Sequence, residues 1–211
     1  MESLIFDIDG TLWDSRALVA EGYNIQLRKE GLERLCTNAE ALKPLFGKVM
    51  TEIGDALFGE FPPEIRYPLM ERCMATENAY LRETPCRIGY PGVRDTLEEL
   101  KKTHRLFIVS NSQQGYPELC IRKLGLEGLI EGHLCFGDTG TDKGTTIRRL
   151  MERWSISSAA YVGDTQGDME ATYAAGLSFI WADYGFGVPT KYDLRISAFR
   201  ELLTLREEGK L

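Results

Sequence analysis

Two aspartates one residue apart, Asp7 and Asp9, directly follow the short apolar run 4–6. Aspartate is depleted in strands, and two neighbouring carboxylates repel each other unless a cation or a proton lies between them. If the run forms a buried strand, its carboxyl end lies where open α/β sheets bind ligands, and Gly10 allows a tight turn there. The pair therefore suits a hard cation and an anionic substrate.

Two further apolar runs, 106–109 and 159–162, also end in residues with polar side chains. Side chains that follow parallel strands meet at one edge of the sheet, where a ligand binds in the crevice. Between these runs, Lys143 opens a segment with helical spacing. The polar residues placed in this way are, in chain order, Asp7, Asp9, Ser110, Asn111, Lys143, Asp164 and Asp168.

This order of an acid pair, a hydroxyl, a lysine and a second acid pair resembles the haloacid dehalogenase superfamily of phosphatases, over residues 2 to about 188. The stretch 7–11 resembles its first motif, Ser110 the second, Lys143 the third, and Asp164 with Asp168 the fourth. One feature departs from the family: its phosphatases usually follow the lysine with proline, and this chain has glycine at 144. That difference allows another loop shape after the lysine.

The resemblance implies a role for each acid of the first motif. Asp7 is expected to be the nucleophile that forms an aspartyl-phosphate. Asp9 is expected to protonate the leaving oxygen and then to activate water, and the nearby Asp7 favours its neutral form. Ser110, the amide of Asn111, and Lys143 are expected to bind the phosphate.

A magnesium site is the second implication of the resemblance. Mg²⁺ prefers octahedral oxygen ligands, and the Asp7 carboxylate, the Asp9 carbonyl and Asp164 would supply three of them. Asp168 opens the next helical pattern, where it is expected either to bind the metal through a water molecule or to serve the helix N-terminus. Both roles for Asp168 stay open at this point.

The pattern of elements predicts an α/β fold: a Rossmann-like three-layer α/β/α core with a parallel sheet, formed by 1–14 and 85–211. Helical and strand patterns alternate after Gly92, which implies parallel strands. Residues 15–84 carry helical spacing with almost no strand signal and resemble the family's inserted helical cap domain. The run 177–181 is expected to be the final strand, and 194–211 a helix with a charged tail.

Composition excludes several classes of protein. The 211 residues carry a net charge of −7, which argues against a nucleic-acid partner. No apolar stretch is long enough to span a bilayer, and the N-terminus lacks a signal-peptide pattern. The cysteines are odd in number and without CxxC spacing, which favours reduced thiols in a cytoplasmic protein. They are Cys36, Cys73, Cys86, Cys120 and Cys135.

These observations predict a Mg²⁺-dependent phosphatase of the phosphoglycolate-phosphatase-like branch, acting on a small phosphorylated metabolite. The closest alternative is a phosphosugar mutase of the same superfamily, although Thr11 matches the phosphatases and mutases commonly carry a bulkier apolar residue there. A cap lysine at 43 or 48 leaves a phosphonate hydrolase open, and a non-catalytic binding protein on the same fold is the alternative from another class. Trp13 is expected in the core, and the loop 184–187 is expected to be structural. The sequence carries no signal for an oligomeric state.

Overall fold

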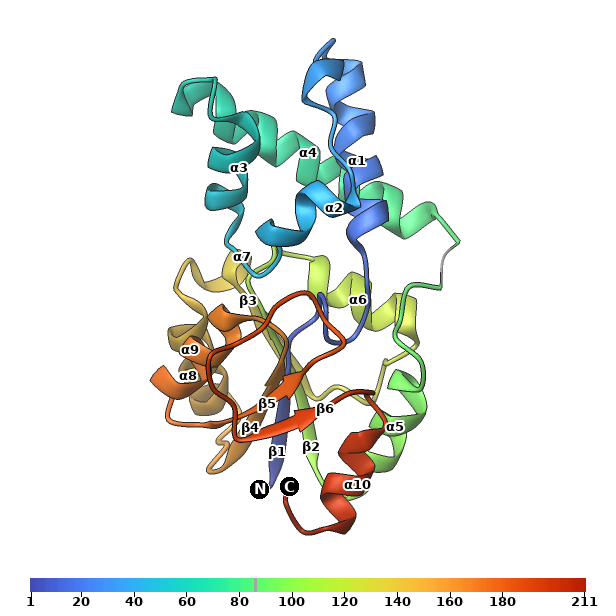
Figure 1. The fold of residues 1–211 in the computed structure, drawn as a ribbon, viewed down its shortest axis with the longest axis vertical. Coiled ribbons are helices and arrows are strands. Elements are labelled where there is room, and N and C mark those ends of the chain that lie inside the picture. Colours follow the sequence, from blue (N-terminus) through green and yellow to red (C-terminus); the bar gives the residue numbers. More distant parts are fainter. Residues whose placement is uncertain (86) are drawn as a thin grey trace. The chain divides into compact units, whose positions relative to one another are not determined.

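The computed structural model describes residues 1–85 and 87–211 and divides them into two compact units (Figure 1). The first unit combines Met1–Asp14 with Ile88–Leu211, and the second is Ser15–Arg87. Cys86, one of the five cysteines, lies outside the described residues. Each unit is described by itself.

A parallel six-stranded sheet forms the centre of the first unit, in the order β3-β2-β1-β4-β5-β6. The chain moves outward from β1 to β3 and then returns to β4 on the other side of β1. Carboxyl ends on either side of such a reversal form a ligand-binding crevice. The strands are β1 (Ser3–Phe6), β2 (Arg105–Ser110), β3 (Gly132–Cys135), β4 (Ala159–Gly163), β5 (Ser178–Ala182) and β6 (Leu194–Ile196).

Helices cover both faces of this sheet, with α8 and α9 on one face and α5, α6 and α10 on the other (Figure 1). The arrangement is the three-layer α/β/α fold predicted from the sequence. The helices of this unit are α5 (Val93–Leu100), α6 (Tyr116–Leu124), α7 (Phe136–Thr139), α8 (Lys143–Arg153), α9 (Gln166–Ala174) and α10 (Glu201–Glu207).

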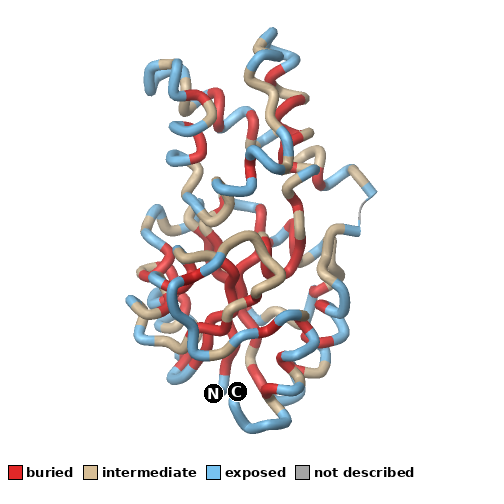
Figure 2. Tube along the Cα trace, viewed as in Figure 1, coloured by how far each residue is buried: buried red, intermediate tan, exposed pale blue. Residues whose placement is uncertain are grey.

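The strands are apolar on both faces because both faces are covered (Figure 2). Ile5, Phe107 and Tyr161 face the layer of α8 and α9 and are fully buried. On the opposite face, Phe6 packs against Phe199 with ring centroids 5.7 Å apart. This packing fixes the strand ends that carry the polar residues.

The expectation for the C-terminal segment was wrong in one respect. Leu194–Ile196 is a sixth strand, and the helix begins only at Glu201. Leu194 pairs with Ile180 and Ile196 with Ala182, in parallel register. Three residues are too few for a periodic pattern to be recognised in the sequence. The segment is a strand because it pairs with the edge of β5.

The second unit is helical in its described part. Its two long helices, α1 and α4, pack closely: a Cβ added at Gly22 would lie 2.6 Å from the Cα of Glu77. Tyr23, Leu69 and Cys73 belong to its buried core. The elements are α1 (Arg16–Lys29), a 3₁₀ turn (Glu33–Leu35), α2 (Ala39–Leu42), a second 3₁₀ turn (Lys43–Leu45), α3 (Met50–Phe58) and α4 (Pro63–Glu83).

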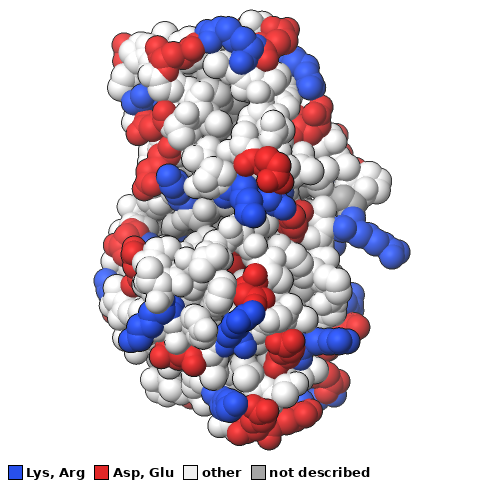
Figure 3. Space-filling view, in the orientation of Figure 1, with Lys and Arg blue, Asp and Glu red and all other residues white. Residues whose placement is uncertain are grey.

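The distribution of surface charge, the character of the helices and the state of the cysteines can be compared with the composition. On the face shown in Figure 3, acidic and basic side chains are interspersed. Within 1–85 and 87–211, no helix combines the length and the apolar character needed to cross a bilayer. The four described cysteines, Cys36, Cys73, Cys120 and Cys135, are free thiols.

Candidate active site

Asp7 stands directly after β1 at the carboxyl edge of the sheet. Its side chain is buried, and its backbone N–H donates to the Val162 carbonyl at 2.9 Å. Because β1 lies between β2 and β4, Ser110 and Asp164 reach the same edge from the two neighbouring strands. The expected convergence of distant polar residues is present.

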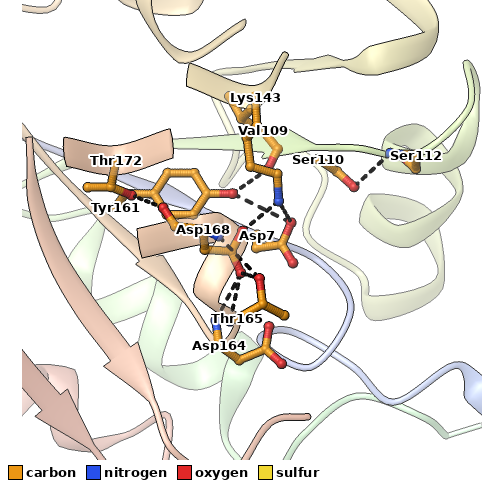
Figure 4. Close-up of polar contacts among 10 residues, drawn as sticks. All are labelled: Asp7, Val109, Ser110, Ser112, Lys143, Tyr161, Asp164, Thr165, Asp168 and Thr172. Atoms are coloured by element: carbon orange, nitrogen blue, oxygen red, sulfur yellow. Dashed lines mark hydrogen bonds and ion pairs between the residues drawn. The ribbon is translucent and has the colours of Figure 1, made fainter. Parts of the chain in front are cut away.

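Lys143 connects two of the predicted acids. It is the first residue of α8, whose N-cap Asp142 accepts a hydrogen bond from the Thr145 amide. Its Nζ donates to Asp7 Oδ1 at 2.8 Å and to Asp168 Oδ1 at 2.6 Å (Figure 4). All three side chains are nearly inaccessible. A buried ammonium is stable only when it is paired and hydrogen-bonded in this way.

Both carboxylate oxygens of Asp168 accept hydrogen bonds from other groups of the protein. Oδ1 binds Lys143, and Oδ2 accepts from the Asp164 amide at 3.2 Å and from the Thr165 amide and hydroxyl at 2.9 and 2.7 Å. Burial alone raises the pKa of Asp168, but Lys143 and the Thr165 donors outweigh it and hold that pKa below the usual range. Of the two roles predicted for Asp168, these contacts match that of a helix cap, which here also holds the lysine.

Asp164 is buried with one carboxylate oxygen left over. Oδ2 accepts from the Phe186 amide at 2.7 Å, whereas Oδ1 has no hydrogen-bond partner among the residues that the structure describes. Burial, followed by the charges of Asp168 and Asp7, raises the pKa of Asp164 well above its ordinary value. A buried carboxylate oxygen without a donor is costly unless a cation or a proton joins it.

Glycines on two loops allow this close packing around Asp164. A Cβ added at Gly10, which has φ +81°, would lie 2.2 Å from Asp164 Oδ2, and one at Gly185 would lie 2.3 Å from Asp164 Cβ. Both positions therefore require glycine: Gly10 for conformation and space, and Gly185 for space.

The three buried acids fit a divalent cation. One carboxylate oxygen each from Asp7, Asp164 and Asp168 can be chosen so that all lie within 4.8 Å of one another. The single ammonium of Lys143 pairs with two of the three carboxylates, Asp7 and Asp168. Burial, which Lys143 offsets only in part, raises the pKa of Asp7 to about 7. Oxygen-only ligands and surplus negative charge suit Mg²⁺, and Asp164 Oδ1, which has no partner among the described residues, could serve as one ligand.

Asp9 lies outside this group of three acids and is half-buried. Its Oδ1 accepts from the Trp13 indole N–H at 2.8 Å and from the Tyr116 hydroxyl at 2.9 Å. Trp13 is fully buried, as expected. The structure thus separates the Asp9 side chain from the candidate metal ligands, which agrees with a role in proton transfer.

Ser110 is the last residue of β2 and Asn111 follows it, at the same edge of the sheet. The Ser110 hydroxyl is buried and accepts from the Ser112 amide at 3.2 Å, and Asn111 is half-buried. In Figure 4, the Ser110 hydroxyl is bonded within its own loop, whereas Lys143 bonds Asp7 directly. Both residues stand at the carboxyl edge of the sheet, where the neighbouring strand β1 leads into Asp7.

Two features of the site were not anticipated as functional. Tyr161 donates its hydroxyl to the Val109 carbonyl at 2.8 Å, with Asp7 Oδ1 at 3.5 Å, and Lys143 Nζ lies 5.7 Å from its ring centroid. A tyrosine in an otherwise aliphatic buried strand was the available signal. The second is the loop 184–187, expected to be only structural, whose Phe186 amide holds Asp164.

Comparisons with known proteins agree with this arrangement. Residues 4–182 match the family model described as haloacid dehalogenase-like hydrolase. The chain is 30% identical to a phosphoglycolate phosphatase of Aquifex aeolicus, with 88% of this chain and 86% of that protein covered. It is 29% identical to a phosphoglycolate phosphatase of Chromobacterium violaceum, with 99% and 98% covered. A crystal structure described as a predicted phosphoglycolate phosphatase from Haemophilus somnus shares the fold, with TM-score 0.83, 21% identity and 98% of each chain covered.

The fold and the site define an α/β protein whose acid cluster and buried lysine lie at the carboxyl edge of a parallel sheet, where such folds bind ligands. The chain belongs to the haloacid dehalogenase-like hydrolase family, in its phosphoglycolate-phosphatase-like branch. The family predicted from the four motifs is thereby confirmed.

Proposed function

We propose that the protein is a Mg²⁺-dependent phosphatase that hydrolyses a small phosphate monoester, with Asp7 as nucleophile. One observation carries this proposal: Asp7 is buried at the carboxyl end of β1, 2.8 Å from Lys143 and beside Asp164, one of whose oxygens has no hydrogen-bond partner within 1–85 and 87–211. Such a site offers a carboxylate for attack together with positive charge for a dianionic substrate. Family membership supports the same reaction.

The first half of the reaction transfers the phosphoryl group to the enzyme. An oxygen of Asp7 forms a bond to phosphorus while the bond between phosphorus and the ester oxygen breaks. The ester oxygen keeps the electron pair and receives a proton from Asp9. Lys143, which is hydrogen-bonded to Asp7, favours the ionised form of that carboxylate and is placed to balance phosphate charge.

The second half releases inorganic phosphate. Asp9, now a carboxylate, takes a proton from a water molecule whose oxygen bonds to phosphorus, and the bond from phosphorus to Asp7 breaks. Asp7 is regenerated with its electron pair. Ser110 and the amide of Asn111 are proposed to hold phosphate oxygens during both steps.

Mg²⁺ is proposed to be held by the carboxylates of Asp7 and Asp164 and the carbonyl of Asp9, with Asp168 contributing at most through water. When bound, it neutralises the negative charge that Asp7 and a phosphate bring together. Asp164 is suited to this task because Phe186, Gly10 and Gly185 fix its position while Oδ1 remains available.

The substrate is proposed to be phosphoglycolate or a similar phosphorylated metabolite of the cytoplasm. Two relatives with 29–30% identity are phosphoglycolate phosphatases. Residues 15–84 are proposed to act as a cap that chooses the substrate and excludes water from the first step, with 1–14 and 85–211 as the catalytic core.

A hydrolysis assay tests the proposal directly. Wild-type protein with Mg²⁺ is expected to release inorganic phosphate from p-nitrophenyl phosphate and from 2-phosphoglycolate, and chelation by EDTA is expected to stop it. Asp7→Asn is expected to abolish turnover, while Asp95→Asn, at an exposed position of α5, leaves it unchanged. Transfer of phosphate back to a sugar without free phosphate would indicate the mutase alternative, and retained turnover in Asp7→Asn would refute the nucleophile.

A further inference from the structure

Two aromatic side chains share a single acceptor on Asp9. The Trp13 indole N–H donates to Asp9 Oδ1 at 2.8 Å, and the Tyr116 hydroxyl donates to the same oxygen at 2.9 Å. Trp13 is 0% and Tyr116 2% exposed. Because both donors are shielded from water, solvent does not compete for them, and the hydrogen bonds are strengthened by the low local dielectric.

The two donors come from separate elements that brace each other. Trp13 lies in the turn after β1, where its carbonyl accepts from the Gly10 amide at 2.9 Å and its amide donates to the Ile8 carbonyl at 3.2 Å. Tyr116 is the first residue of α6, 107 residues beyond Asp9. The rings of Trp13 and Tyr116 meet edge to face, with centroids 5.4 Å apart. The donor positions are thus set by backbone structure and by mutual packing.

We propose that Trp13 and Tyr116 are positioning residues that fix the Asp9 carboxyl for proton transfer. The two donors favour negative charge on Oδ1, and proton transfer is assigned to Oδ2 on this geometry. With Oδ1 held from two directions, the carboxyl cannot exchange its two oxygens by rotation. This inference rests on the proposed function, in which Asp9 is the general acid and base.

The two hydrogen bonds from Trp13 and Tyr116 to Asp9 also match the change of charge during the reaction. As the Oδ2–H proton moves to the ester oxygen, the bond from phosphorus to that oxygen breaks and Asp9 becomes a carboxylate. Hydrogen bonds to a carboxylate are stronger than hydrogen bonds to the neutral acid. Donors that strengthen as the proton leaves stabilise the transition state more than the bound substrate, which is the condition for catalysis.

A comparison of leaving groups tests this role. Phenyl phosphate and p-nitrophenyl phosphate are similar in shape, but nitrophenolate departs without help from an acid, whereas phenolate needs the proton more. The variants are Trp13→Phe, Tyr116→Phe and the double variant. Tyr116→Phe removes only the hydroxyl, whereas Trp13→Phe removes the N–H together with part of the buried indole but keeps an aromatic side chain. For the double variant, kcat/KM for phenyl phosphate is expected to fall by about 100-fold. For p-nitrophenyl phosphate, kcat/KM is expected to fall by only about tenfold. KM is expected to stay within about threefold, since neither donor is proposed to hold the phosphate.

Matched controls remove similar groups elsewhere in the same unit. Trp181→Phe deletes a buried indole N–H that has no hydrogen-bond partner in the described part of the chain, and Tyr192→Phe deletes the hydroxyl of an exposed tyrosine. Both are expected to leave the two rates unchanged. Circular dichroism confirms that each variant is folded, and Tyr116→Phe alone, the more conservative change, is expected to show the same substrate dependence in smaller measure.

The outcomes separate this inference from the proposed function. Equal loss on both substrates, or no loss on either, would overturn the positioning role and leave the phosphatase intact. Absence of hydrolysis by wild-type protein with Mg²⁺ would overturn the phosphatase, and the inference with it.

Discussion

Replacing Asp7 by asparagine is expected to make the metal-free protein more stable while abolishing its activity. Asparagine has nearly the shape of the protonated acid and carries no charge. In the metal-free protein, burial raises the pKa of Asp7 from 3.8 to about 7, although Lys143 opposes the shift. The folded state therefore disfavours the ionised side chain that the reaction needs.

The size of the effect follows from the shift in pKa. Each unit corresponds to about 1.4 kcal/mol, so ionised Asp7 costs the folded, metal-free protein on the order of 4 kcal/mol at pH 8. The folded protein retains a proton that the unfolded chain releases between pH 3.8 and about 7, so the wild type loses stability as pH rises through this window. The advantage of Asp7→Asn is expected to shrink to about 2 kcal/mol at pH 5.

Urea unfolding followed by circular dichroism measures these differences. Wild type, Asp7→Asn and the exposed control Asp95→Asn are compared at pH 5 and pH 8 in excess EDTA. The control is expected to stay within about 1 kcal/mol of the wild type at both pH values, since it removes only an exposed charge in the first turn of α5. The explanation that burial disfavours ionised Asp7 would be refuted if Asp7→Asn were less stable than the wild type at pH 8. It would also be refuted if the stability difference between the two proteins did not change with pH.

Four further outcomes follow from the same contacts. Mg²⁺ at 100 times its dissociation constant is expected to raise the free energy of unfolding of the wild type by about 2.7 kcal/mol, and a calorimetric scan should show no such gain in Asp164→Ala. Gly185→Ala brings a Cβ to 2.3 Å from Asp164 Cβ, so isothermal titration should show Mg²⁺ affinity reduced at least about tenfold; unchanged affinity would argue against Asp164 as a ligand. Lys143→Met leaves Asp7 and Asp168 buried without their cation and is expected to lower stability by about 3 kcal/mol in urea titrations at pH 8, a loss that should diminish at pH 5. Tyr161→Phe leaves the Val109 carbonyl without its donor and is expected to cost about 1 kcal/mol while the ring beside Lys143 keeps kcat within about threefold; a much larger kcat loss would give the hydroxyl a direct part in the reaction.

Local sequence was sufficient to locate the strands that carry the site. The runs 4–6, 106–109 and 159–162 lie within β1, β2 and β4, because strands covered on both faces are short apolar segments bounded by turns. The acids were identified for a related reason. Charged residues that directly follow a buried strand are costly unless they bind a ligand or pair with another group. By contrast, β6 was missed because its three residues form a strand only beside β5.

The internal bonding of the site was beyond local sequence. Lys143 and Asp7 are 136 residues apart, and only the packing of α8 on the sheet brings them to 2.8 Å. Trp13 was read as a core residue, which it is, but its indole N–H is aimed at Asp9 together with a hydroxyl from α6.

Sequence by itself determined which residue types stand at the ends of which strands, and with them the family and the class of reaction. Tertiary structure alone decided that Asp168 bonds Lys143 through one oxygen and caps α9 through the other. It also decided that one oxygen of Asp164 has no donor in the part of the chain that the structure describes. The physical reason is that the periodicity and turn preference of a segment act over a few residues. How deeply a side chain is buried, and which charges it pairs with, depends on all the helices, strands and loops that surround it in the folded protein.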